Sequence, residues 1–337
     1  MDAASALEEI ARLLERELAN PYKARAFRKA LGIVESLGPD AVVAKVADGT
    51  LRRTPGIGDT TYAVIAEASA GRVPAYLAEL REQAGTTGAP SGLAAQLRGD
   101  LHSHSEWSDG TTSIAAMAKA AAAAGLEYVA LTDHSPNLRV ANGLTAERLA
   151  DQLDLIDALE ESGGLGVRIL RGIEVDILED GALDQSPAML DRLDVVVASV
   201  HSKLRSPADV MTERMLRAVA DPHVDVLGHC TGRLIRGSRG TRPPSEFDAE
   251  AVFTACAANG VAVEINSRPE REDPPPELLA LARDLGCLFS IDSDAHAPGH
   301  YGFLPLGAAR AEAAGIPADR IVTTWPLERL LDWSRGR

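Results

Sequence analysis

The sequence has few cysteines and no long apolar run, and both absences exclude classes of protein. Its 337 residues include three cysteines, an odd number without close spacing, so no disulfide framework is indicated. No apolar run reaches the roughly 18 residues of a membrane-spanning helix. The first residues are acidic and fit an amphipathic helix, whereas an export signal begins with basic residues and an apolar block. We therefore expect a cytoplasmic protein with reduced thiols and no membrane association.

Basic residues are outnumbered, and the net charge of −15 speaks against simple electrostatic adhesion to nucleic acid. Residues 1–98 carry equal numbers of acidic and basic side chains, so the excess negative charge belongs to residues 99–337. If part of this acidity surrounds bound cations, the net charge overstates the repulsion of a phosphate group.

Two sequence patterns divide the chain. Residues 5–82 show apolar side chains at helical spacing, interrupted by turn sequences, and residues 85–92 are small and turn-forming. From Gly99 onward, seven short apolar runs alternate with helix-like segments, which predicts an α/β fold with a parallel sheet buried on both faces. Seven such units are enough to close a barrel. We divide the chain into a helical domain over residues 1–84, a linker over residues 85–98 and an α/β domain over residues 99–337.

Histidines and carboxylates follow the predicted strands. Six of the eight histidines lie at strand ends, and reactive residues of parallel barrels gather at the C-terminal ends of the strands. Imidazole and carboxylate ligands suit Zn²⁺, Mn²⁺ or iron. Nine ligands are too many for one ion, so they indicate two or three ions with Glu174 as a candidate bridge. The candidates are His102, His104, Asp109, His134, Glu174, His201, His229, Asp294 and His296. His223 and His300 fall outside this pattern and are expected in a turn and a loop.

A cluster of this kind suits phosphoryl chemistry. One ion lowers the pKa of a water molecule, giving hydroxide near neutral pH, and a neighbouring ion stabilises charge on the phosphate oxygens. Lys203, Arg233, Arg268 and Arg271 lie near the same motifs and could hold the phosphate, with a surface salt bridge as the alternative for each. Three further carboxylates neighbour the ligands and could orient them: Asp100, Asp133 and Asp176.

The motifs DLHSHSEWSDG, LTDHS, GIEVDIL, SVHSK, GHCTGRL, EINSRPERED and IDSDAH resemble, in order, those of the PHP (polymerase and histidinol phosphatase) family. The match is best to the PHP domain of bacterial family X DNA polymerases and covers residues 99–325. The resemblance implies a distorted (β/α)7 TIM-like barrel with three divalent ions, Mn²⁺ or Zn²⁺, with iron as a further option. It implies three ligand groups: His102, His104, Glu174 and Asp294; Glu174, His201 and His229; and Asp109, His134 and His296.

The same resemblance marks conserved and altered positions around these ligands. The family X domain also keeps Arg233 and Arg271 basic, which implies a role for both at the phosphate. Arg268 stands where that domain has an uncharged residue, and Cys230 stands in place of proline. These two departures could alter the fit of a substrate but should leave the metal ligands intact.

The segment LRRTPGIGDTTYAVIAEASAG, residues 51–71, resembles a helix-hairpin-helix motif. Open backbone N–H groups at Gly56, Ile57 and Gly58 could bind a nucleic-acid phosphate without reading sequence. The earlier segment NPYKARAFRKA is similar to the small helical domain of family X polymerases, and Lys23 and Arg25 could extend a basic face. Asp59 stands where the family usually has lysine. The alternative is a helical domain that binds protein or only packs.

Three functions follow from these features. The first is a phosphoesterase of DNA repair that uses metal-activated hydroxide, as a 3′–5′ exonuclease, 3′-phosphatase or abasic-site endonuclease. The second is a small-molecule phosphomonoesterase of the histidinol-phosphatase type. The third is a binding module with a structural metal site. Only the linker separates the two domains, so we expect no polymerase activity. The expected partner is DNA, and the sequence does not identify a protein partner.

Overall fold

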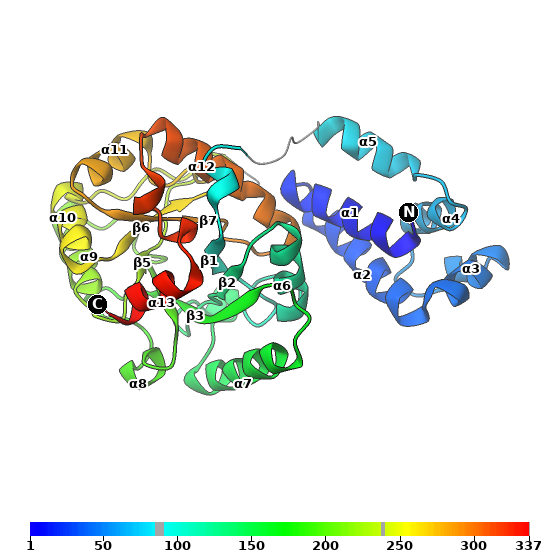
Figure 1. Cartoon of the computed structure of the whole chain (residues 1–337), viewed down its shortest axis with the longest axis horizontal. Helices are drawn as coiled ribbons and strands as arrows, with labels where there is room; N and C mark the ends of the chain where they lie inside the picture. Colours follow the sequence, from blue (N-terminus) through cyan, green and yellow to red (C-terminus); the bar gives the residue numbers. More distant parts are fainter. Residues whose placement is uncertain (85–90, 237–239, 337) are drawn as a thin grey trace. The chain divides into compact units, whose positions relative to one another are not determined.

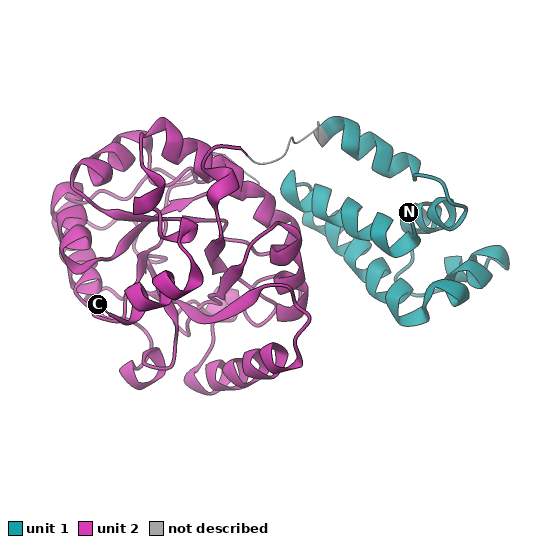
Figure 2. Ribbon diagram, in the orientation of Figure 1, with its two compact units in different colours: residues 1–89 teal, residues 90–337 magenta. Residues whose placement is uncertain are grey.

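The computed structural model describes residues 1–84, 91–236 and 240–336, and the chain divides into two compact units, residues 1–89 and 90–337 (Figure 2). Of the linker predicted over residues 85–98, residues 85–90 lie outside the described residues. The rest of that segment packs on the second unit: Leu93 is buried in its core, and its N–H donates to the Glu312 carboxylate. The second unit therefore begins several residues before its first strand.

The described part of the first unit is helical, as its apolar periodicity predicts. Asp2 caps the first helix by accepting the Ser5 N–H at 2.8 Å, and Gly38, with φ of +77°, ends the second. Apolar faces of these helices, including Leu7, Ile10 and Phe27, form a core of their own. The helices are α1 (Ala3–Arg16), α2 (Pro21–Leu37), α3 (Pro39–Ala47), α4 (Asp59–Ser69) and α5 (Ala75–Ala84), with a 3-10 turn at η1 (Leu51–Arg53) (Figure 1).

The second unit is a nearly closed parallel barrel, which confirms the predicted fold class. Seven strands within the described residues form one sheet in sequence order, and each pairs in parallel with the next (Figure 1). Most strand residues are buried because helices cover the outer face. The strands are β1 (Gly99–Ser103), β2 (Tyr128–Leu131), β3 (Arg168–Asp176), β4 (Val195–Ser199), β5 (Val226–Leu227), β6 (Ala262–Asn266) and β7 (Leu288–Asp292).

Several connecting helices start at side-chain caps. Ser113, Thr145 and Asp248 each accept a backbone N–H from the first turn of the helix that follows, which satisfies a donor that the helix leaves open. The α-helices are α6 (Ile114–Ala123), α7 (Ala146–Ser162), α8 (Pro187–Leu190), α9 (Ala208–Val219), α10 (Ala249–Asn259), α11 (Pro276–Asp284), α12 (Leu304–Ala313) and α13 (Leu327–Arg335). The 3-10 turns are η2 (Ala94–Gln96), η3 (Arg139–Ala141), η4 (Pro298–Phe303), η5 (Ala318–Arg320) and η6 (Val322–Thr324).

The C-terminal segment packs against the residues at which the strands begin. Leu330 of α13 and Trp325 lie in one apolar cluster with first-half residues of β1 to β6. The buried Tyr128 hydroxyl donates to the Trp325 carbonyl at 2.9 Å, and a Cβ at residue 99 would lie 1.8 Å from the Tyr128 ring, so only glycine fits there. This packing leaves the opposite end of the barrel, where the strands finish, to carry the site.

Strand β1 meets the segment that follows β7 at an isolated bridge between Ser103 and Ala295, and carboxylates join the two strands beside it. Asp292 accepts the Leu101 N–H at 2.8 Å, and Asp100 accepts the N–H of Ser293 at 3.2 Å as well as its hydroxyl. Burial raises the pKa of Asp100 to about 7 and that of Asp292 well above its ordinary range. Asp100, expected to orient ligands, thus also joins the first and last strands.

The three cysteines are free and buried. None of the helices in the described part of the chain combines the length and the apolar character that a membrane crossing requires.

His223 lies before β5, away from the strand ends, and we expect it to make stability depend weakly on pH. Burial lowers its pKa, but hydrogen bonds to Asp221 at 2.7 Å and Asp191 at 3.1 Å outweigh burial and raise the pKa above 6.5. The contribution of the charged His223 ring to the free energy of unfolding is then fully present below pH 6.5, and it is lost as the pH rises through the folded-state pKa. Because the ring is partly exposed, His223→Gln should cost only about 0.5 kcal/mol in urea unfolding at pH 5.5. An equal cost at pH 9 would contradict this assignment, and Asp191→Asn should show the same pH dependence.

Candidate metal centre

The nine predicted ligands come together at the C-terminal ends of the strands. His102 lies on β1 and Glu174 on β3, while the other seven lie in the segments that directly follow β1, β2, β4, β5 and β7. Parallel strands place these segments at the same end of a barrel, so residues almost 200 positions apart become neighbours. Each of the nine has a possible ligand atom within 4.8 Å of at least two others in its group.

Glu174 lies in the middle of the cluster. Its carboxylate is buried, and neither oxygen has a hydrogen-bond partner among the described residues. Burial alone would raise the pKa of this carboxyl, but the charges of His102, His201 and His134 outweigh it and hold the pKa well below its usual range. The nearest ring nitrogens are those of His134 at 2.8 Å, His229 at 3.0 Å, His102 and His201 at 3.3 Å, and His104 at 3.7 Å.

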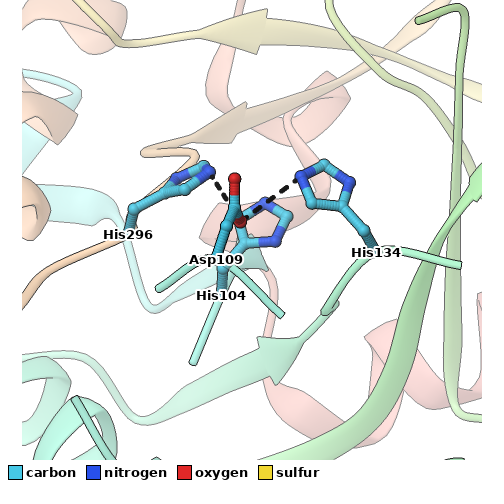
Figure 3. A group of neighbouring side chains, drawn as sticks. All are labelled: His104, Asp109, His134 and His296. Carbon is cyan, nitrogen blue, oxygen red and sulfur yellow. Dashed lines mark ion pairs between the residues drawn. The ribbon is translucent and has the colours of Figure 1, made fainter. Parts of the chain in front are cut away.

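A second group surrounds Asp109. Figure 3 shows the side chains of His104, His134 and His296 directed toward this carboxylate. Its Oδ1 lies 3.3 Å from His296 Nε2 and 3.5 Å from His134 Nε2. Burial and the charges of His296 and His134 lower the pKa of His104 to about 3, so this imidazole is neutral, the form that binds metal. The Asp109 side chain is 38% exposed, so this group is the more accessible part of the cluster.

The donor atoms fit divalent ions. Buried ring nitrogens of His102, His104, His134, His201 and His229 lack hydrogen-bond partners among the described residues, as do both Glu174 oxygens. Buried polar atoms are normally paired, and cations would satisfy those that face Glu174 together with its two oxygens: Nε2 of His102, His104 and His201, and Nδ1 of His134. Nitrogen and carboxylate ligands suit Zn²⁺, Mn²⁺ or iron. The geometric groups are His104, Asp109, His134 and His296; His102, Glu174 and His229; His102, His104 and Asp294; and His134, Glu174 and His201.

These geometric groups differ from the predicted grouping: Glu174 is not grouped with His104 or Asp294, and His201 and His229 fall in separate groups. His104 lies as close to the Asp109 group as to Asp294, and His134 lies beside Glu174 as well as Asp109. Both histidines therefore lie between two possible ion positions.

Carboxylates outside the cluster hold its ligands in place. Asp176 accepts the His201 N–H at 3.2 Å and lies 3.5 Å from Nδ1 of the same residue. Asp133 accepts the Ser105 N–H and hydroxyl and the Gln152 amide, which fixes the segment that leads to Asp109. Such contacts orient metal ligands and raise their basicity.

Glu264 and Asn266 are two site residues that sequence reasoning missed. Glu264 on β6 lies 2.5 Å from His102 Nδ1 and accepts the His229 N–H at 2.5 Å. The Asn266 amide donates to both Glu264 and Asp294. One signal could have found Glu264: a carboxylate inside the apolar strand VAVEIN needs a buried partner.

The predicted phosphate-binding cations differ in their surroundings. Lys203 is 62% exposed and lies 3.9 Å from Glu179. Arg233 donates to the carbonyls of Arg271 and Glu272, so its guanidinium braces the loop after β6.

Arg268 and Arg271 are both buried beside Asp294. Arg268 is paired with Glu270 and also contacts the Asp294 carbonyl and His296 Nδ1. Arg271 Nε lies 3.2 Å from the Asp294 carboxylate, yet Nε and Nη1 have no hydrogen-bond partner in the described residues. Among these four cations, Arg271 is the one with buried, unused donors.

The predicted DNA-binding residues lie in the first unit. Gly56 has φ of +101°, and a Cβ there would lie 2.7 Å from the Lys29 side chain, so glycine is required. The Ile57 N–H donates to the Thr54 carbonyl, and the Gly58 N–H donates to the Thr61 hydroxyl. Two of the three N–H groups predicted to be open are therefore bonded within the hairpin. Lys23 and Arg25 are exposed on α2.

A family comparison agrees with this site. The PHP domain family matches residues 100–268. The chain belongs to the PHP family. Membership places it among the metal-dependent phosphoesterases, which are hydrolases of ester bonds.

Relatives of this PHP chain differ in architecture. It is 44% identical to DNA polymerase/3′-5′ exonuclease PolX of Bacillus subtilis over 201 residues, 60% of this chain and 34% of PolX. It therefore spans about a third of the length of that relative. It is 31% identical to the probable phosphatase YcdX of Escherichia coli over 229 residues, 63% of this chain and 83% of YcdX. A solved structure of histidinol phosphate phosphatase from Lactococcus lactis, complexed with zinc, L-histidinol and phosphate, is also similar, with a TM-score of 0.47 and 19% sequence identity. The match covers 65% of this chain and 94% of that phosphatase chain.

Proposed function

We propose that the protein hydrolyses phosphate esters of DNA, at 3′ ends or at damaged positions, with divalent ions bound at the strand ends. The observation that carries this proposal is the cluster of nine His, Asp and Glu candidate ligands beside the unpartnered Nη1 of Arg271. The reaction would be that of a 3′–5′ exonuclease, a 3′-phosphatase or an abasic-site endonuclease in repair.

The ions would be held by the four geometric groups around Glu174 and Asp109. Three ions, Mn²⁺ or Zn²⁺ with iron as a further option, match the number of ligands. Divalent ions supply an acidified water and positive charge for the phosphate oxygens. His104 is already neutral and Glu174 already ionised, as binding needs, whereas His102 and His201, whose pKa values Glu174 raises despite their burial, would release protons as the ions bind.

The chain's own residues bind and orient the phosphate group. Arg271 would donate from its buried Nη1, which has no hydrogen-bond partner among the described residues, to a phosphate oxygen, as a charge-assisted hydrogen bond. Arg233 holds the Arg271 and Glu272 carbonyls and so keeps that guanidinium at the site. Glu264 fixes the ring of His102 through Nδ1, which leaves Nε2 directed at Glu174. Lys203, exposed at the rim, would contact a more distant phosphate.

DNA as the substrate is supported by the identity to PolX and by the hairpin of the first unit, with Gly56, Ile57, Gly58, Lys23 and Arg25 as its candidate contacts. The second candidate is a small-molecule phosphomonoesterase. The internal bonds of Ile57 and Gly58 favour it, because they reduce the hairpin's capacity for phosphate, as does the similarity to the probable phosphatase YcdX.

The test is a gel assay of the full chain with Mn²⁺. The substrates are 5′-labelled oligonucleotides with a 3′-hydroxyl, a 3′-phosphate or an internal abasic site, and His104→Ala serves as the contamination control. Cleavage by the wild type alone supports the proposal, and the pattern of products identifies the reaction. If all three substrates stay intact while histidinol phosphate or another phosphomonoester is hydrolysed, the small-molecule function replaces it.

Asp59→Asn is expected to strengthen DNA binding by the hairpin. In the native protein the Asp59 carboxylate accepts two hydrogen bonds from Arg52, at 2.7 and 3.0 Å, on the exposed surface. Removing this charge frees Arg52 for a phosphate, so affinity for duplex DNA should rise about three- to tenfold at 50 mM salt, and the salt slope should steepen by about 1. Fluorescence anisotropy in EDTA measures this, with Asp40→Asn as the charge-matched control. Equal affinities of the two variants would show that the hairpin does not bind phosphate.

A further inference from the structure

Arg214 is a buried arginine of α9. Its guanidinium donates to backbone carbonyls and to one serine hydroxyl in the segments that follow β3 and β4. Its Nε donates to the carbonyls of Ile177 and Leu178, at 3.0 and 2.7 Å. Its Nη1 donates to the Ser202 carbonyl at 2.8 Å, and Nη2 contacts the Ile177 carbonyl and the Ser202 hydroxyl. The side chain is 2% exposed. One guanidinium therefore joins the segment after β3 to the segment after β4.

The acceptors of Arg214 directly follow residues of the metal centre. Ile177 comes after Asp176 and three residues after Glu174, and Ser202 comes after His201. The Asp176 carboxylate in turn accepts the His201 N–H at 3.2 Å. The guanidinium thus joins the two segments just beyond the end of the β3–β4 ladder, next to Glu174 Oε1 and His201 Nε2, which lie 3.3 Å apart.

The segment after β3 lies directly on the backbone of α9. Gly181 has φ of +83°, and a Cβ there would lie 2.7 Å from the Arg214 carbonyl and 2.6 Å from the Arg217 Cβ. Only glycine allows this approach, and the approach brings the Ile177 and Leu178 carbonyls within reach of Arg214.

We propose that Arg214 is a positioning residue, which sets the distance between Glu174 and His201 and so the affinity for the ion that both would bind. All of its hydrogen bonds go to neutral oxygens, although burying a guanidinium is costly without a bonded carboxylate. Lysine cannot replace it, because three donors on one nitrogen do not reach carbonyls on both segments. The inference rests on the proposed metal centre but not on the identity of its substrate.

The test compares Arg214→Lys with Arg320→Lys in metal-free full-length protein titrated with Co²⁺. Arg320 also donates to backbone carbonyls, those of Cys287 and Arg283, but these precede β7 and lie away from the strand ends. We expect Arg214→Lys to weaken Co²⁺ binding at one site by about 10- to 100-fold and to change the visible Co²⁺ absorption. Arg320→Lys should lower the Tm but keep the wild-type Co²⁺ spectrum and affinity.

Gly181→Ala is the second variant, used if Arg214→Lys does not fold. It pushes the segment off α9 without changing Arg214 or any ligand, and it should weaken Co²⁺ binding in the same direction. Wild-type Co²⁺ affinity and spectrum in the folded variant would overturn the role of Arg214 while leaving the metal centre intact. Failure of the wild-type protein itself to bind Co²⁺ would overturn the proposed centre and this inference together.

Discussion

Glu174→Gln is expected to reduce phosphate-ester hydrolysis by roughly three orders of magnitude or more. Five imidazoles approach this carboxylate, and both of its oxygens lack hydrogen-bond partners among the described residues. Glutamine keeps the size of the side chain but offers one oxygen and no charge, so the cluster loses the anion at its middle. Bound ions contribute several kcal/mol to such reactions, and each 1.4 kcal/mol is a tenfold change in rate.

The measurement pairs steady-state turnover with metal content after dialysis. Glu179→Gln is the matched control, because Glu179 follows the same strand but is exposed and pairs only at 3.9 Å with Lys203. We expect Glu174→Gln to lose both metal and activity and Glu179→Gln to keep both. A Glu174→Gln protein with full metal content and turnover would refute the assignment of Glu174 as a shared ligand.

Arg271→Ala is expected to lower kcat/KM by about 10²- to 10³-fold while metal content stays unchanged. Its buried Nη1 atom has no hydrogen-bond partner in the described structure, so it is free to donate to a phosphate oxygen. Removing one such preorganised donor from a site that stabilises charge typically costs this much. Arg271→Lys should recover only part of the loss, since a compact ammonium does not reproduce the fixed directions of the guanidinium donors.

Lys203→Ala is the comparison for this prediction, because the same motifs predict a phosphate contact but the side chain is largely exposed. A small effect of Lys203→Ala beside a large effect of Arg271→Ala would assign phosphate binding to Arg271. Equal and small effects, with metal content unchanged, would show that neither cation contacts the reacting phosphate.

That the nine candidate ligands come together could be predicted because their positions depend on local patterns alone. Each lies on or just after a buried strand, and a parallel barrel brings all strand ends to one side, so no knowledge of loop conformation was needed. His104 and His134 show the limit of this argument. Their assignment to one ion or another depends on side-chain directions that spacing does not encode.

The supporting residues could not be predicted because their roles depend on partners far away in the sequence. Glu264 acts on His102, 162 residues earlier, and Arg214 acts on carbonyls 12 to 37 residues away. The cations near the motifs show the same limit. Arg233 and Arg271 were both predicted to hold the phosphate, but Arg233 donates to the backbone and Arg271 keeps an unpartnered Nη1.

The seam between the first and last strands has a consequence for how the protein is made. His296 follows His102 by 194 residues, so the earliest ligands must wait for nearly the whole barrel to be translated. At 5 to 20 residues per second this interval is roughly 10 to 40 s. During it the nascent chain carries only partial sets of ligands, without Asp294 or His296. The two ligand groups that include Asp294 or His296 can therefore form only when the last strand closes the barrel, whereas the two that contain Glu174 are complete once residue 229 has been made.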